Sequence, residues 1–166
     1  MQSNQSDNIP PFADRFAKMI FTRYPEWEQY RVDPDMRWQV EDDLAIEVPS
    51  RLSPKCPLRI ETIDEMIIIS WVGWHEHFYD WGGTYMEDKF ISRAFEIIDK
   101  ILVDKYVVAI AWKDDRILAA EIFRSDAINK KLHKGFWAKA VEDEQVVAIS
   151  WNGNYDRGQF DPAKCW

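Results

Sequence analysis

Residues 66–85 read M-I-I-I-S-W-V-G-W-H-E-H-F-Y-D-W-G-G-T-Y, an apolar run that passes directly into aromatic, histidine and acidic side chains. The β-branched residues at 67–69 are typical of a strand buried in a protein core. The residues from Trp74 to Tyr85 combine large aromatic rings with charge, which is typical of a binding surface. The stretch therefore predicts both the centre of the core and the most promising place for a functional site.

One strand pattern occurs three times in the chain. Residues 67–71 (IIISW), 108–112 (VAIAW) and 147–151 (VAISW) each end on a Trp that is followed by turn residues. On a strand, the first, third and fifth residues of each segment share one face. We expect the three strands to lie in one sheet, with the small residues of the opposite face admitting a closely packed helix.

Apolar spacing predicts two main helices. The first covers residues 10–24, before Pro25, and its apolar side comprises Phe12, Phe16, Met19 and Ile20. The second covers residues 86–103, where Thr84 and Glu87 match a capping box. Its apolar stripe comprises Phe90, Ile91, Ala94, Phe95, Ile98, Ile101 and Leu102.

Alternating apolar and polar residues predict the remaining strands. They cover a hairpin at 36–48, a hairpin of 58–63 with 66–71, and strands at 106–112, 117–123, 136–141 and 146–151. A short helix is expected from Ser125 to Leu132. The predicted fold is a single α+β domain over residues 10–166, after a flexible tail at 1–9. It has a mainly antiparallel sheet of about five to seven strands, packed against two or three helices.

Charge and composition narrow the class of partner. The 166-residue chain has a formal net charge of -8. A nucleic acid would need a basic face, so we expect no nucleic-acid partner. An acidic surface suits a basic protein, although solubility alone is a simpler reason for the charge. The polar start M-Q-S-N-Q-S-D-N and the short apolar runs predict no signal peptide, no membrane span and a cytoplasmic location.

Few residues suggest catalysis. The chain has no G-x-S-x-G and no glycine-rich phosphate loop, and the carboxylate runs at 42–43, 114–115 and 142–144 lie in predicted turns. Cys56 and Cys165 form no C-x-x-C motif, so we expect free thiols. We therefore predict no catalytic residue and no cofactor.

His75 and His77 are the candidates for a metal site. Two residues apart on an extended segment, their side chains point the same way, and neutral imidazoles bind zinc. The sequence places no third ligand beside them. Histidines that hydrogen-bond on an aromatic surface are the simpler interpretation, and a metal-dependent enzyme or metal-binding protein is the alternative function.

The aromatic residues between Trp71 and Tyr85 allow two kinds of binding. Sugars stack on Trp faces, whereas protein interfaces use Trp and Tyr as anchors beside charged rims. Without a signal peptide, a carbohydrate-binding module is the less favoured reading. We expect about half of these rings, Trp71 and Phe78 among them, to fill the core instead.

The cluster W-x-x-W-H-E-H-F-Y-D-W at 71–81, together with the acidic turns, resembles the immunity proteins of bacterial polymorphic-toxin and contact-dependent inhibition systems. The resemblance implies a non-catalytic inhibitor that binds a cognate toxin through an acidic and aromatic surface, which would suit a cationic toxin domain. It carries no family residue over to this chain, and it leaves the oligomeric state open. The expected contact residues are Trp74, His75, Glu76, His77, Tyr79, Asp80, Trp81, Tyr85, Asp114 and Asp115.

Overall fold

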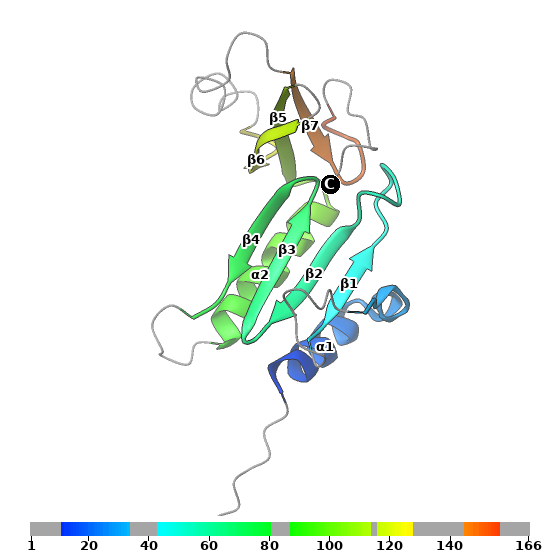
Figure 1. Ribbon diagram of the computed structural model, residues 1–166, viewed down its shortest axis with the longest axis vertical. Helices are drawn as coiled ribbons and strands as arrows, with labels where there is room; N and C mark the ends of the chain where they lie inside the picture. Colours follow the sequence, from blue (N-terminus) through cyan, green and yellow to red (C-terminus); the bar gives the residue numbers. More distant parts are fainter. Residues whose placement is uncertain (1–10, 34–42, 81–86, 114–115, 128–144, 157–166) are drawn as a thin grey trace, which may run out of the picture.

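Two antiparallel sheets and the helices beside them form the described part of the computed structural model (Figure 1). The structure describes residues 11–33, 43–80, 87–113, 116–127 and 145–156. One sheet has four strands in the order β1-β2-β3-β4, and the other has three in the order β6-β5-β7. The α+β prediction is confirmed, with the strands divided between two sheets.

The four-stranded sheet is built from neighbouring hairpins. It comprises β1 (Ala45–Val48), β2 (Leu58–Ile63), β3 (Met66–Trp71) and β4 (Trp74–Phe78). The predicted hairpin of β2 and β3 is confirmed with its bounds. Turn residues follow Trp71, as the sequence indicated, but the turn is only two residues long and returns the chain as the edge strand β4, which the sequence analysis did not predict.

That turn has an unusual backbone for its sequence. Val72 and Gly73 have φ angles of 49° and 78°. Positive φ at both central residues defines the tight hairpin turn whose twist matches the strands. A β-branched residue rarely adopts such an angle. Val72 is fully buried, so its packing in the core offsets the backbone strain.

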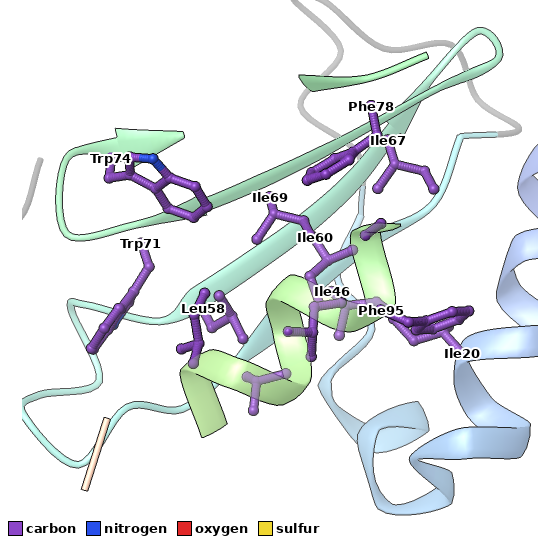
Figure 2. Packing of buried hydrophobic residues seen from close by; sticks show 14 of the residues in the cluster. Ile20, Ile46, Leu58, Ile60, Ile67, Ile69, Trp71, Trp74, Phe78 and Phe95 are labelled. Carbon is purple, nitrogen blue, oxygen red and sulfur yellow. The ribbon is translucent and has the colours of Figure 1, made fainter. Parts of the chain in front are cut away.

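The helices cover one face of the four-stranded sheet. They are α1 (Phe12–Arg23), the 3-10 helix η1 (Pro25–Tyr30) and α2 (Glu87–Leu102). Figure 2 shows Ile60 of the sheet turned towards α2, and Ile20 of α1 belongs to the same buried cluster as Ile60 and Phe95 of α2. Both main helices lie within the predicted ranges.

One detail of the helix prediction differs from the structure, and another lies partly outside the described residues. Met19 is 41% exposed rather than packed in the core, because it lies on the outer side of α1. The partner expected for Glu87, Thr84, lies outside the described residues. The Glu87 carboxylate accepts hydrogen bonds from Arg15 of α1.

The three-stranded sheet comprises β5 (Tyr106–Lys113), β6 (Arg116–Arg124) and β7 (Gln145–Ser150). The central strand β5 pairs antiparallel with both neighbours. The expectation that the three similar strands share a sheet is therefore wrong for β3. Both edges of β3 are occupied by the strands next to it in the chain, β2 and β4.

The two sheets share one core. Trp71 of β3 and Trp151 after β7 have ring centroids 5.5 Å apart. The branched residues of β5 and β7, such as Ile110 and Ile149, belong to the same buried cluster as Ile98 of α2. The small residues Ala109 and Ala148 of the other face form a separate cluster with Phe123. α2 therefore packs on the face of the branched residues and not on the face of the small ones.

Several predictions need a correction or lie outside the described residues. In the predicted 36–48 hairpin only β1 is described, and it pairs with β2. The strand at 136–141, the tail at 1–9 and the helix beyond residue 127 lie outside the described ranges. Cys56 is disulfide-bonded, so the expectation of a free thiol there is wrong. No helix among the described residues is long and apolar enough to span a membrane.

Candidate functional site

The edge strand β4 divides the predicted contact residues between the two faces of its sheet. Trp74 and Phe78 point into the core and are 5% and 3% exposed. His75 and His77 are exposed on the opposite face. This is the alternation that a strand imposes. Phe78, like Trp71, fills the core as predicted, whereas Trp74 is buried and does not offer a contact surface.

Glu76 lies on the same side of β4 as the buried aromatic residues. Because β4 is the edge strand, its half-buried carboxylate reaches α2 and lies 3.6 Å from the Arg93 guanidinium. The Arg93 guanidinium also lies 6.0 Å from the centre of the Phe78 ring. Glu76 therefore helps to attach β4 to α2 and is only partly accessible to a partner.

The two exposed histidines form a contact with each other. The ring centroids of His75 and His77 are 5.3 Å apart, in an edge-to-face arrangement. His77 Nδ1 lies 3.3 Å from the Met66 sulfur on the neighbouring strand β3. No group of three or more His, Cys, Asp or Glu side chains among the described residues could hold a metal ion. Local packing on this face accounts for the pair.

A cavity of about 330 Å³ opens where β4 ends, beside the turn that joins β2 to β3. Its walls come from the start of α1, the β2–β3 turn, the end of β4 and the start of α2, which meet at the lower end of the molecule in Figure 1. The lining residues are Phe12, Ile63, Asp64, Glu65, Met66, Tyr79, Asp80, Glu87 and Phe90.

The floor of the cavity is aromatic and apolar. The rings of Phe12 and Phe90 come from different helices, and their centroids are 5.8 Å apart with a 40° tilt. Phe12 is buried and also stacks on Phe16 of the next helical turn. The two helices therefore hold these rings in fixed positions, while Ile63 and Met66 complete the apolar surface.

Carboxylates surround the mouth of the cavity. Asp64 and Glu65 are exposed on the β2–β3 turn, where Asp64 has a φ of 54°. Asp is one of the few residues that tolerates this left-handed conformation. Within the described ranges neither carboxylate takes part in an ion pair. Asp80, at the end of β4, adds a third acidic side chain.

The fourth carboxylate is already neutralised by an arginine of the chain. Arg15 of α1 donates from Nη2 to Glu87 Oε2 at 2.7 Å and from Nε to Oε1 at 3.1 Å. The same guanidinium lies 5.8 Å from the centre of the Phe12 ring. The charge that remains at the mouth therefore comes mainly from Asp64 and Glu65.

The structure brings only part of the predicted contact set to this cavity. Tyr79 and Asp80 line it, while His75 and His77 lie further along β4. Trp81, Tyr85, Asp114 and Asp115 lie outside the described residues. The sequence analysis missed the contributions of Phe12, Phe90 and the Asp64–Glu65 turn. Two adjacent acids at a hairpin turn were a visible signal, but we interpreted them only as turn residues.

No protein-family model, no curated protein and no solved structure matches this chain.

A second polar cluster joins α1 to α2. The Tyr24 hydroxyl donates to Asp99 Oδ1 at 2.5 Å, and Arg23 binds the same carboxylate. Burial, followed by the bond to Asp99, raises the pKa of Tyr24 to about 12. Burial alone would raise the pKa of Asp99, but the bonds from Tyr24 and Arg23 outweigh it and lower that pKa. Both groups keep one protonation state near neutral pH, so the cluster attaches the helices to each other.

A third cluster attaches the turn after β7 to the end of α2. The buried carboxylate of Asp104 accepts hydrogen bonds from the Asn152 backbone N–H and from Asn154 Nδ2, both at 2.7 Å. Asn152 Nδ2 donates in turn to the Leu102 carbonyl at 2.8 Å. Both Asp104 carboxylate oxygens and the Leu102 carbonyl oxygen accept a hydrogen bond from an N–H group. The cluster therefore has a structural role and joins the end of α2 to the turn after β7.

Proposed function

We propose that the chain is a non-catalytic inhibitor that binds a cationic protein, and that it acts as an immunity protein against a bacterial toxin. The observation that carries the proposal is the cavity at the end of β4, with its aromatic floor and its rim of carboxylates. Protein interfaces place aromatic anchors at the centre and charge at the rim, and complementary charge accelerates association.

The pattern of perturbed ionisation also supports binding over catalysis. Catalytic acids and bases have pKa values adjusted to their task and lie in clefts. Among the described residues, clear shifts of pKa occur at Arg23, Tyr24, Asp99 and Lys100. Burial is the main cause for Tyr24, and hydrogen bonds to neighbouring side chains set the direction of the shift for Arg23, Asp99 and Lys100. The shifted groups are thus structural, and none of them lines the acidic cavity.

The proposal places the protein in the cytoplasm, where it would meet a toxin that has entered the cell. Cytosolic thiols are kept reduced, so the disulfide at Cys56 makes this placement testable. Cells would be quenched in acid, denatured and alkylated, and Cys56 would be examined by mass spectrometry. The disulfide of the structure predicts an oxidised Cys56, which would place the chain in an oxidising compartment and contradict the cytoplasmic placement, whereas an alkylated Cys56 would support that placement.

The function is tested by co-expressing the chain with toxin domains encoded beside its gene, scoring cell growth and measuring affinity by calorimetry. Asp64→Asn removes one turn charge and Glu65→Lys reverses the other, and Asn keeps the left-handed backbone at position 64. Glu26→Gln with Glu28→Lys changes the net charge equally on the exposed helix η1. The first variant should lose about tenfold or more in affinity, mainly through slower association, and the second should lose little.

Two results would contradict the proposal. One is growth protection that survives in the turn variant with unchanged affinity. The other is an equal loss in both variants, which would mean that the chain attracts its partner by net charge and not through this surface. Far-UV circular dichroism of each variant confirms that the fold is intact.

A further inference from the structure

We infer that the cavity at the end of β4 receives one arginine side chain of the protein partner, which acts as the anchor of the complex. This inference rests on the proposed function, because it names the chemical group that the acidic surface recognises. A cavity of about 330 Å³ is at the lower end of the size range of ligand pockets. One long side chain suits such a space better than a folded segment.

The floor suits a guanidinium in particular. Guanidinium groups are planar and stack on aromatic faces. The half-buried ring of Phe90 lines the cavity from α2, with the buried Phe12 ring packed beside it, and Tyr79 adds a further ring just after β4. The methylene groups of an arginine would pack on Ile63 and Met66 while the charged end stays near the mouth.

The mouth offers two adjacent carboxylates on an exposed turn. Asp64 and Glu65 both belong to the β2–β3 turn, and the partly buried Asp80 lines the cavity just after β4. Arginine carries five N–H donors in a rigid fork and can bind several carboxylate oxygens at once. A lysine ammonium is a compact point charge and a strongly hydrated one, so it would use this arrangement less fully.

The chain itself contains an arginine held in this way at the same rim. Arg15 binds Glu87 through two N–H donors while its guanidinium lies against the Phe12 ring. Both Glu87 and Phe12 line the cavity. The local combination of a carboxylate and an aromatic ring therefore already binds a guanidinium. A second arginine would repeat this contact with the Asp64 and Glu65 carboxylates.

The test uses small probes on the complete chain. Nα-acetyl-arginine methylamide is titrated into the ¹⁵N-labelled protein and followed by NMR, beside the citrulline analogue, which has nearly the same shape and no charge. We expect saturable shifts at the amides of Asp64, Glu65, Asp80 and Phe90. The citrulline probe should bind at least tenfold more weakly, and the lysine probe should fall between the two.

Variants confirm the site and its chemistry. Asp64→Asn with Glu65→Gln should weaken arginine binding by about fivefold or more, while the matched control Glu26→Gln with Glu28→Gln should leave it unchanged. Phe90→Leu keeps apolar bulk but removes the ring face, and it should also weaken binding. Equal binding of arginine and citrulline, shifts located elsewhere, or an unaffected turn variant would overturn the inference.

The outcome for the cavity can be separated from the outcome for the function. If the turn variant loses affinity for the toxin but the arginine probe does not bind, the inference of an arginine in the cavity is wrong and the inhibitor proposal stands. If the probe binds as expected but the chain neither binds nor neutralises a toxin, the cavity stands and the proposed function is wrong.

Discussion

At the scale of single residues, Asp104 is the side chain on which the junction of α2 with the turn after β7 depends. Its carboxylate holds Asn152 and Asn154, and its backbone has a φ of 55°. Replacing it by Ala removes both hydrogen bonds and leaves a residue that disfavours this angle. We expect Asp104→Ala to lower the free energy of unfolding by about 2–4 kcal/mol in urea titrations.

Two further variants separate the causes of that loss. Asp104→Gly removes the carboxylate but tolerates the left-handed backbone, so it should cost about 1 kcal/mol less than Asp104→Ala. Asp126→Ala removes a carboxylate that pairs with Arg124 on the surface and should change stability by less than about 1 kcal/mol. If Asp104→Ala lowered the free energy of unfolding as little as Asp126→Ala, the hydrogen bonds of Asp104 would contribute nothing measurable to stability.

At Val72 two effects on stability oppose each other, because its buried side chain packs favourably while its backbone is strained. Val72 and Val108 are both fully buried, but only Val72 has a positive φ, of 49°. Truncation to Ala removes similar apolar surface at each position and relieves the strain of a β-branched residue at position 72 alone. Val72→Ala should therefore cost about 1 kcal/mol less than Val108→Ala in the free energy of unfolding. Equal costs, measured by urea denaturation, would mean that the turn stores no strain.

At the scale of elements, the contact between α1 and α2 depends on pH at the alkaline end. The pKa of Tyr24 is raised from 10.0 to about 12. A raised pKa means that the folded protein holds this proton more tightly than the unfolded chain. The corresponding stability is fully present below pH 10 and is lost as the pH rises towards 12.

Tyr24→Phe tests this dependence. The variant lacks the ionisable hydroxyl, so the difference in unfolding free energy between the wild type and the variant should shrink as the pH is raised from 9 to about 11.5. Chemical denaturation at each pH measures it. The tyrosinate absorbance that disappears in the variant should titrate well above the ordinary value of 10.0. A constant difference across this range would rule out the shifted ionisation.

The edge strand β4 shows how an element decides the availability of functional residues. A strand sends alternate side chains to opposite faces, so Trp74 and Phe78 enter the core while His75 and His77 remain outside. The sequence analysis correctly predicted that Phe78 would be buried. It offered Trp74 as a contact residue because it did not predict that the sheet continues past the turn at Val72.

At the scale of the whole molecule, the two sheets should unfold together. One buried cluster contains residues of both sheets and of both main helices, and Trp71 contacts Trp151 between them. Residues that share a core usually unfold in one cooperative step. Urea transitions followed by Trp fluorescence and by far-UV circular dichroism should therefore coincide. Two separate midpoints would show that the sheets are independent units.

The sequence by itself determined the local elements and the fold class. The bounds of β2, β3 and α2 follow from alternating and helical apolar spacing, which are short-range patterns that a chain shows without its neighbours. The burial of Trp71 and Phe78 follows from the same alternation. The acidic charge of the surface is likewise a property of composition.

The tertiary structure alone decided which elements meet. It assigned β3 to a different sheet from β5 and β7 although the three segments are alike in sequence, because hairpin pairing had already occupied both edges of β3. It also assembled the acidic cavity from α1, the β2–β3 turn, β4 and α2. Arg15 and Glu87, which meet at its rim, are 72 positions apart in the chain. Local patterns carry no information about such contacts, because they depend on how complete elements pack against one another.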